Sequence, residues 1–206
     1  MKKAIIVLVL ISSFYAVKAQ EEEKSGDKKK GGFKKENLFV GGDLTLGFSN
    51  SYTALGISPY FGYSVNKYLD VAVSANINYT SQRDYVVYGD KVRQTVYGPG
   101  AFVRVYPVRF LFAQAQYEHN FISVKYLPAE NSGYLKTTDR VDANSFLVGA
   151  GWAGGRSEDN KSFYYISVSW DLLRNENSPY VDGLKRAIPI FKAGYNIALF
   201  QGRGNR

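Results

Sequence analysis

Alternating apolar and polar residues characterise the chain from Leu38 onward, and no stretch of useful length follows the period of a helix. Glycine, asparagine and aspartate interrupt the alternation at intervals, as is typical of the turns between antiparallel strands. Each alternating segment has about 9 to 11 residues, the length with which a tilted strand crosses a hydrocarbon layer. The pattern predicts strands over 38–48, 54–63, 70–80, 96–106, 111–119, 145–153, 163–172 and 190–200.

The two faces of these strands differ in kind. One carries apolar residues and tyrosine without a charge, for example Leu44, Leu46 and Ile57. The other carries glycines and small polar residues, and its larger polar residues are predicted to form a network: Asp43, Arg104, Gln114, Gln116, Glu118, Asp171 and Lys192. A soluble sandwich or lipocalin shows the same alternation with the apolar face inside. The uncharged face, the small opposite residues and the aromatic strand ends favour the inverted arrangement.

Aromatic residues gather at both ends of the predicted strands, as they do at the two interfaces of membrane barrels. One predicted girdle comprises Tyr63, Tyr68, Tyr106, Phe110, Trp152, Phe163 and Phe200. The other comprises Phe48, Tyr52, Tyr79, Tyr97, Tyr117, Phe121, Phe146 and Trp170. An open sheet edge in lipid would leave backbone groups unpaired, so the sheet must close. The predicted fold class is therefore all-β, a closed antiparallel eight-stranded up-and-down transmembrane β-barrel.

The first residues have a different composition. Lys2 and Lys3 precede an apolar run over 4–17, and Ala19 completes a small-residue cleavage site, so residues 1–19 are predicted to be a signal peptide. Residues 20–37 are rich in lysine and acids and are predicted to be a disordered charged linker. The barrel is expected over 38–200, followed by a tail over 201–206.

Composition narrows the functional classes further. The 206 residues contain no cysteine and a single histidine, which argues against a disulfide framework, a metal site or a cofactor held by such ligands. The formal charge of +8 falls to +5 once the three lysines of the predicted signal peptide are removed. Part of the basic character is therefore expected to serve export. Nucleic acid is not an expected partner, since the basic run is mixed with acids and the protein is exported.

The connections between the strands predict the orientation. Long segments over 81–95, 120–144 and 173–189 alternate with short turns, and membrane barrels place their long loops outside the cell. Loops on a rigid scaffold carry most binding residues, and tyrosine and arginine are frequent interface anchors. The predicted loop contacts are Arg83, Tyr85, Tyr88, Arg93, Lys125, Tyr126, Tyr134 and Arg140.

Three stretches carry a resemblance to a known family. The first covers 56–71 and begins with Gly56-Ile57-Ser58-Pro59-Tyr60-Phe61-Gly62-Tyr63. The second covers 100–117 and is interrupted by a turn, and the third is the closing Ala193-Gly194-Tyr195-Asn196-Ile197-Ala198-Leu199-Phe200. Over 38–200 the chain resembles the small eight-stranded outer-membrane β-barrels of Gram-negative bacteria, which include OmpA-type transmembrane domains and PorT-like barrels. The resemblance implies a location in the outer membrane, lipid and lipopolysaccharide as partners, and envelope proteins as further candidates. It implies a monomer. The family usually ends on an aromatic residue, whereas here six residues follow Phe200.

Three functions remain open at this stage. The first is a non-enzymatic barrel with a structural or interaction role, as part of an envelope or secretion complex. The second is a small pore or transporter, in which the inward charges select solutes, although an eight-stranded lumen is only wide enough for side chains. The third is a lipid-modifying enzyme using His119 and Ser123, but the chain lacks the His-x-Ser spacing of deacylase barrels.

Overall fold

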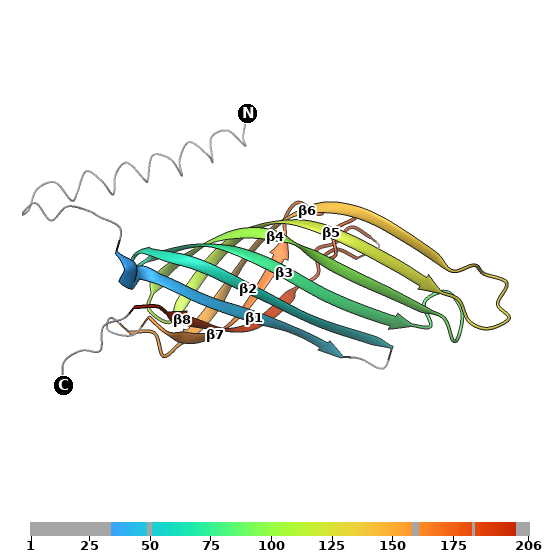
Figure 1. The fold of residues 1–206 in the computed structure, drawn as a ribbon, viewed down its shortest axis with the longest axis horizontal. Helices are drawn as coiled ribbons and strands as arrows, with labels where there is room; N and C mark the ends of the chain where they lie inside the picture. Colours follow the sequence, from blue (N-terminus) through green and yellow to red (C-terminus); the bar gives the residue numbers. More distant parts are fainter. Residues whose placement is uncertain (1–33, 49–50, 158–160, 183, 201–206) are drawn as a thin grey trace, which may run out of the picture. The chain divides into compact units, whose positions relative to one another are not determined.

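Eight consecutive antiparallel strands form a closed barrel in the computed structural model, which describes residues 34–48, 51–157, 161–182 and 184–200. The strands are β1 (Leu38–Phe48), β2 (Tyr52–Asn66), β3 (Leu69–Arg83), β4 (Lys91–Val108), β5 (Leu111–Leu127), β6 (Thr137–Gly154), β7 (Phe163–Asp171) and β8 (Ile190–Ala198). Each strand pairs with its neighbours in sequence, and β1 pairs with β8 to close the ring (Figure 1). The predicted up-and-down eight-stranded barrel is confirmed.

The predicted signal peptide and the C-terminal tail lie outside the described residues. The last three residues of the segment predicted to be a disordered linker, Lys35–Asn37, form a single 3-10 turn that leads into β1. No helix in the described ranges has the length and apolar character needed to cross a bilayer.

The faces of the strands have the predicted inverted arrangement. Large apolar side chains point away from the barrel, and Leu46 and Phe191 keep 63% and 68% of their surface exposed. Asp43, Arg104, Glu118, Asp171 and Lys192 are buried inside. Because side chains alternate along a strand, this inside-out arrangement follows directly from the period of two in the sequence.

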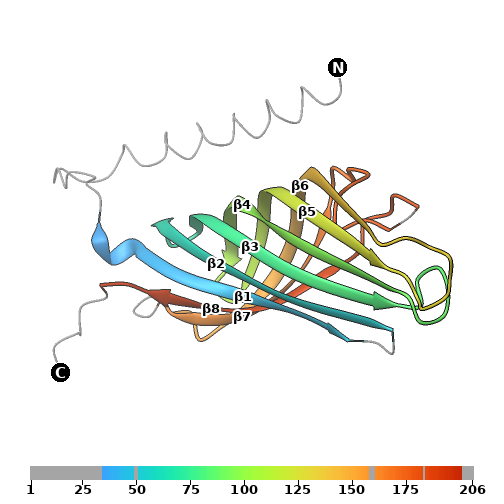
Figure 2. The ribbon, with the colours of Figure 1, turned by 45° about the vertical axis from the view of Figure 1, so that its right-hand side comes forward.

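The strands differ in length, which divides the barrel into two ends. We call the end with the start of β1 and the last residue of β8 the termini end, and the opposite end the hairpin end. β4, β5 and β6 have 18, 17 and 18 residues, whereas β7 and β8 have 9 each. The longer strands therefore continue past β7 and β8 at the hairpin end (Figure 2).

Two of the three predicted long loops are much shorter than expected. The connection between β3 and β4 is limited to 84–90, and that between β5 and β6 to 128–136. The predicted limits were wrong because the apolar alternation fades where both faces of the sheet become polar, while β-branched residues such as Val92, Thr95 and Val124 continue to favour the strand. The segment after β7 spans 172–189, and its described residues contain one isolated bridge, between Val181 and Ala187.

Candidate functional site

A cluster of aromatic side chains fills the interior of the barrel near the termini end. Its buried members are Phe39, Tyr60, Phe102, Tyr106, Phe112, Phe163 and Tyr165, together with Ala72 and Ala153. The rings pack edge-on or tilted against one another, with centroids 5.2 to 6.2 Å apart. Tyr106 and Phe163 were predicted in an outer girdle, and this assignment was wrong, because their strand parity turns both rings into the lumen. The side chains of Phe48 and Tyr52, also assigned to a girdle, lie outside the described residues.

Inward glycines make room for these rings. Tyr60 and Phe39 lie opposite Gly41 and Gly62 in the β1–β2 register. The same pairing joins Phe112 to Gly151 and Tyr165 to Gly194. A Cβ atom at any of the four glycines would overlap the facing ring. The alternating pattern predicted the inward glycines but not the rings that cover them, because only the strand register brings the two together.

Arg104 is the charged centre of this cluster. Its guanidinium carbon lies 4.5 Å from the ring centroids of Phe112 and Tyr165 and 4.9 Å from that of Phe102. Its Nε donates a hydrogen bond to Gln114 Oε1 at 2.9 Å. A cation in contact with several desolvated ring faces is stabilised by their quadrupoles, so the aromatic cluster takes the place of a counter-ion.

A chain of hydrogen bonds continues from Arg104 along the inner face of β5. Gln114 Nε2 donates to Gln116 Oε1, and Gln116 Nε2 donates to Glu118 Oε1, both at 2.8 Å. Asn120 Nδ2 donates to Glu118 Oε2 at 3.3 Å. Residues two apart on a strand share a face, so the predicted polar residues of β5 form one continuous ladder.

The remaining predicted lumen charges surround this ladder. Lys192 Nζ lies 3.6 Å from Asp43 Oδ1 and 4.0 Å from Glu118 Oε1, and it connects three strands. Tyr165 donates its hydroxyl to Asp43 Oδ2 at 3.3 Å. Asp171 stands apart from the lysine: it accepts the Ser178 hydroxyl at 2.6 Å and the Phe146 N–H at 3.0 Å. The structure therefore joins six of the seven predicted lumen residues through direct contacts. The seventh, Asp171, holds the segment 172–189 and reaches the ladder through Ser178, Ser145 and Asn120.

This segment enters the hairpin end of the lumen, which the sequence did not indicate. Tyr180 is buried against Leu147 and Ile190, and its hydroxyl donates to Glu118 Oε2 at 2.8 Å. Further along the segment, hydrogen bonds hold the pKa of Asp182 below its usual value despite partial desolvation. The donors are the backbone N–H of Arg186, the Arg186 guanidinium and the backbone N–H of Leu184. Tyr180 therefore occupies part of the lumen toward the hairpin end, and the aromatic cluster fills the lumen near the termini end.

The predicted loop contacts are mostly strand residues. Arg93, Lys125, Tyr126 and Arg140 belong to β4, β5 and β6, and Arg83 is the last residue of β3. Tyr85, Tyr88 and Tyr134 do lie in turns, and Tyr88 is 92% exposed.

A basic surface covers the outward side of the extended strands. Arg83 faces Lys91 across β3 and β4, and Arg93 faces Lys125 across β4 and β5. Arg140 lies one row nearer the apolar belt, opposite Ser123. Like charges placed directly opposite each other destabilise a sheet. Among the described residues, none of these five cations forms a salt bridge.

The turn 84–90 is organised around a buried carboxylate. Asp90 accepts the backbone N–H groups of Tyr85, Val86 and Val87 at 2.6 to 3.0 Å and the Tyr126 hydroxyl at 2.9 Å. Desolvation raises the pKa of Asp90, but these hydrogen bonds outweigh it and hold the pKa below its usual value. The turn is therefore a fixed support for the exposed Tyr88.

The arrangement around the single histidine does not resemble a nucleophile–base pair. His119 Nδ1 lies 2.7 Å from Asn144 Oδ1, and its ring packs edge-on against Phe121. No described serine hydroxyl is hydrogen-bonded to His119. Within the described part of the chain, no group of three or more histidine, cysteine or acidic residues is arranged to hold a metal ion.

Comparisons with known proteins find similar solved structures but assign the chain to no family. No protein-family model matches the chain, and no curated protein matches its sequence. Among solved structures, the chain is similar to the attachment invasion locus protein Ail of Yersinia pestis, with 11% identity over 78% of this chain and 96% of that one and a TM-score of 0.45. It is also similar to Neisserial surface protein A, with 10% identity over 79% of this chain and 97% of that one and a TM-score of 0.43. The N-terminal β-barrel domain of Pseudomonas aeruginosa OprF is 14% identical over 78% of this chain and 95% of that one, with a TM-score of 0.40. The assignment of this chain as an eight-stranded barrel rests on its own strand pairing.

Proposed function

We propose that this protein is an integral outer-membrane β-barrel with a structural or interaction role, in which the hairpin end faces the outside of the cell. The observation that carries the proposal is the uncharged apolar face around the barrel, with the ionic network buried inside it. A continuous apolar surface of this extent would cause aggregation in water, whereas in a bilayer it contacts the hydrocarbon chains of the lipid.

The basic surface of Arg83, Lys91, Arg93, Lys125 and Arg140 supports lipopolysaccharide as the partner on the outer side. It begins immediately beyond Tyr97 and Phe121, whose outward rings lie 5.5 Å apart and mark the edge of the apolar belt. Phosphate groups of lipopolysaccharide occupy that level of an outer membrane and would relieve the repulsion between the opposed cations. The exposed tyrosines at the hairpin tips, Tyr88 and Tyr134, extend further out and suit contact with an envelope protein.

A charge-reversal experiment tests this assignment. In vesicles containing lipopolysaccharide, the wild-type barrel should unfold at a higher temperature than in phosphatidylethanolamine alone. R93E/K125E should lose most of this gain, about 1 kcal/mol for each cation removed, because its carboxylates repel phosphate. Heat-modifiable migration on gels measures unfolding in both membranes.

The matched control is K34E/K35E, which makes the same change in net charge at exposed residues of the termini end. It should retain the wild-type gain. An equal gain in both double variants would rule out the basic surface as the lipopolysaccharide contact. A wild-type chain that stays folded and soluble without detergent would rule out the membrane location altogether.

Conductance separates this role from that of a pore. The aromatic cluster fills the lumen near the termini end, so the folded wild-type barrel should give no current steps in a planar bilayer. Y180A should also give none, because the aromatic cluster still closes the termini end. Steady openings of the heat-modifiable wild-type protein would establish a pore instead.

A further inference from the structure

The seam that closes the barrel is incomplete toward the hairpin end. The β1–β8 ladder runs from the Phe39–Ala198 pair to the Leu44–Ala193 pair, and β1 continues to Phe48. At the same level β8 is paired only with β7, through residues 190–192. On its β8 side, the end of β1 therefore has no strand partner among the described residues, and an opening separates the two strands.

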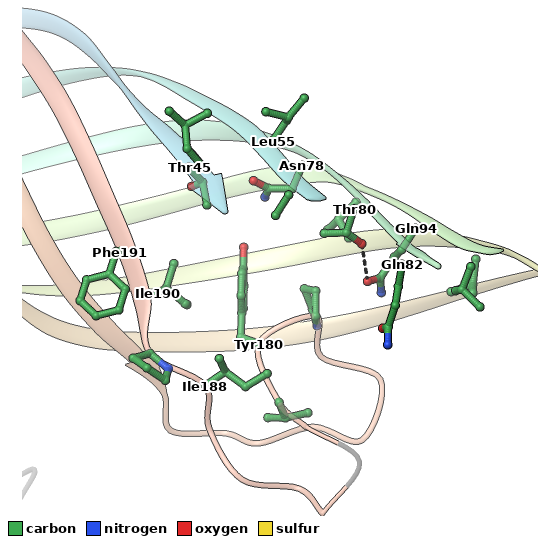
Figure 3. A pocket seen from close by; sticks show the side chains of 18 of the residues that line it. Thr45, Leu55, Asn78, Thr80, Gln82, Gln94, Tyr180, Ile188, Ile190 and Phe191 are labelled. Carbon is green, nitrogen blue, oxygen red and sulfur yellow. Dashed lines mark hydrogen bonds between the residues drawn. The ribbon is translucent and has the colours of Figure 1, made fainter. Parts of the chain in front are cut away.

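A cavity of about 600 Å³ occupies this opening, a volume within the range of small-molecule sites. It is bounded by Thr45 and Leu46 of β1 and by Ile190 and Phe191 of β8. Figure 3 shows the Tyr180 ring standing in the cavity between the β8 residues and the side chains of β3 and β4. Because Leu46 and Phe191 belong to the apolar outer face, the cavity joins that face to the inside of the barrel.

The lining defines the chemistry of a ligand. Apolar side chains form the entrance, and the inner wall carries the polar residues Asn78, Thr80, Gln82 and Gln94. Thr80 and Gln94 are joined by a long hydrogen bond of 3.5 Å, whereas the side-chain amides of Asn78 and Gln82 bond to no described residue. These amides can donate and accept hydrogen bonds to a ligand.

The described lining residues favour an uncharged ligand head over an ionic one. Every described side chain that lines the cavity is neutral. Glu118 of the network already accepts the hydroxyl of the lining residue Tyr180. An ionised head group would lose its hydration in this site without gaining a counter-ion, which makes its burial costly.

We infer that this cavity binds one hydrocarbon chain with an uncharged, hydrogen-bonding head, of the monoacylglycerol class, entering from the membrane through the incomplete β1–β8 seam. The chain would lie against Leu46, Leu55 and Phe191, and the head would reach the amides of Asn78 and Gln82. This site rests on the proposed membrane location but is independent of the basic surface.

Binding of 1-monopalmitoylglycerol to the purified, heat-modifiable barrel tests the inference, measured by native mass spectrometry and equilibrium titration. Wild type should bind one molecule saturably and prefer it to palmitate. A54W should weaken binding at least about tenfold, because Ala54 is buried in the cavity wall and the indole would fill the space. A75W is the matched control, since Ala75 is an exposed outward residue of β3, and it should bind as wild type does.

Q82M provides a second variant that keeps the size of the side chain and removes the amide. It should weaken binding of monopalmitoylglycerol and reduce its advantage over palmitate. Equal binding by A54W and A75W, equal affinity for palmitate, or no saturable binding by an inserted wild-type barrel would each overturn the ligand site and leave the proposed membrane role intact. Failure of the wild-type chain to insert would instead count against that role.

Discussion

E118A should be the most destabilising single substitution in the lumen, lowering the free energy of unfolding by about 3–5 kcal/mol. Glu118 is fully buried and accepts hydrogen bonds from Gln116, Asn120 and Tyr180. It also lies 4.0 Å from Lys192. Removing the carboxylate leaves the donors of Gln116 and Tyr180 without an acceptor and removes a nearby negative charge from the buried Lys192. It leaves the Asn120 donor only the 3.5 Å hydrogen bond to Ser145. Urea unfolding in lipid vesicles, followed by gel migration, measures the change.

Two companion variants show whether charge or packing is responsible. E118Q keeps an acceptor for some of the donors and should lose only about 1–3 kcal/mol, the cost of one unsatisfied buried group. E36A removes an exposed carboxylate from the 3-10 turn and should be nearly neutral. If E118A unfolded at the same urea concentration as E36A, the lumen network would have no role in holding the barrel together.

The neighbouring glycines of β1 should respond to alanine in opposite directions. A Cβ atom on Gly41 would overlap the Tyr60 ring and the Tyr195 carbonyl oxygen, whereas one on Gly42 would meet Pro59 Cα at 3.6 Å, an ordinary contact. G41A should therefore destabilise the barrel by about 1–3 kcal/mol through overpacking. G42A should be neutral or stabilising by up to about 1 kcal/mol, because alanine restricts the unfolded chain.

The same unfolding assay compares the two variants directly, and each serves as the control for the other. They change adjacent residues by the same methyl group in the same strand, so strand propensity cancels between them. A G41A barrel as stable as the G42A barrel would mean that Tyr60 has space to move, and that the aromatic cluster is not tightly packed around the inward glycines.

The alternation of the sequence determined the number of strands, their order and the face that each residue occupies. Leu46 and Ile57 are exposed, and Asp43 and Lys192 are buried, as their parity predicts. This information is local, because side chains of an extended chain alternate with a period of two whatever the strand pairs with. The limits of β4 to β6 were harder to predict, since polar residues on both faces remove the apolar signal without ending the backbone ladder.

Only the tertiary structure decided what the interior contains. The register sets Tyr60 against Gly41 and Phe112 against Gly151, which turns a glycine-rich face into an aromatic-filled lumen. The short β7 and β8 leave the seam open and allow Tyr180 to reach Glu118 from 62 residues away. Contacts between residues so distant in sequence depend on strand stagger and closure, and these quantities have no signature in the periodicity of any one strand.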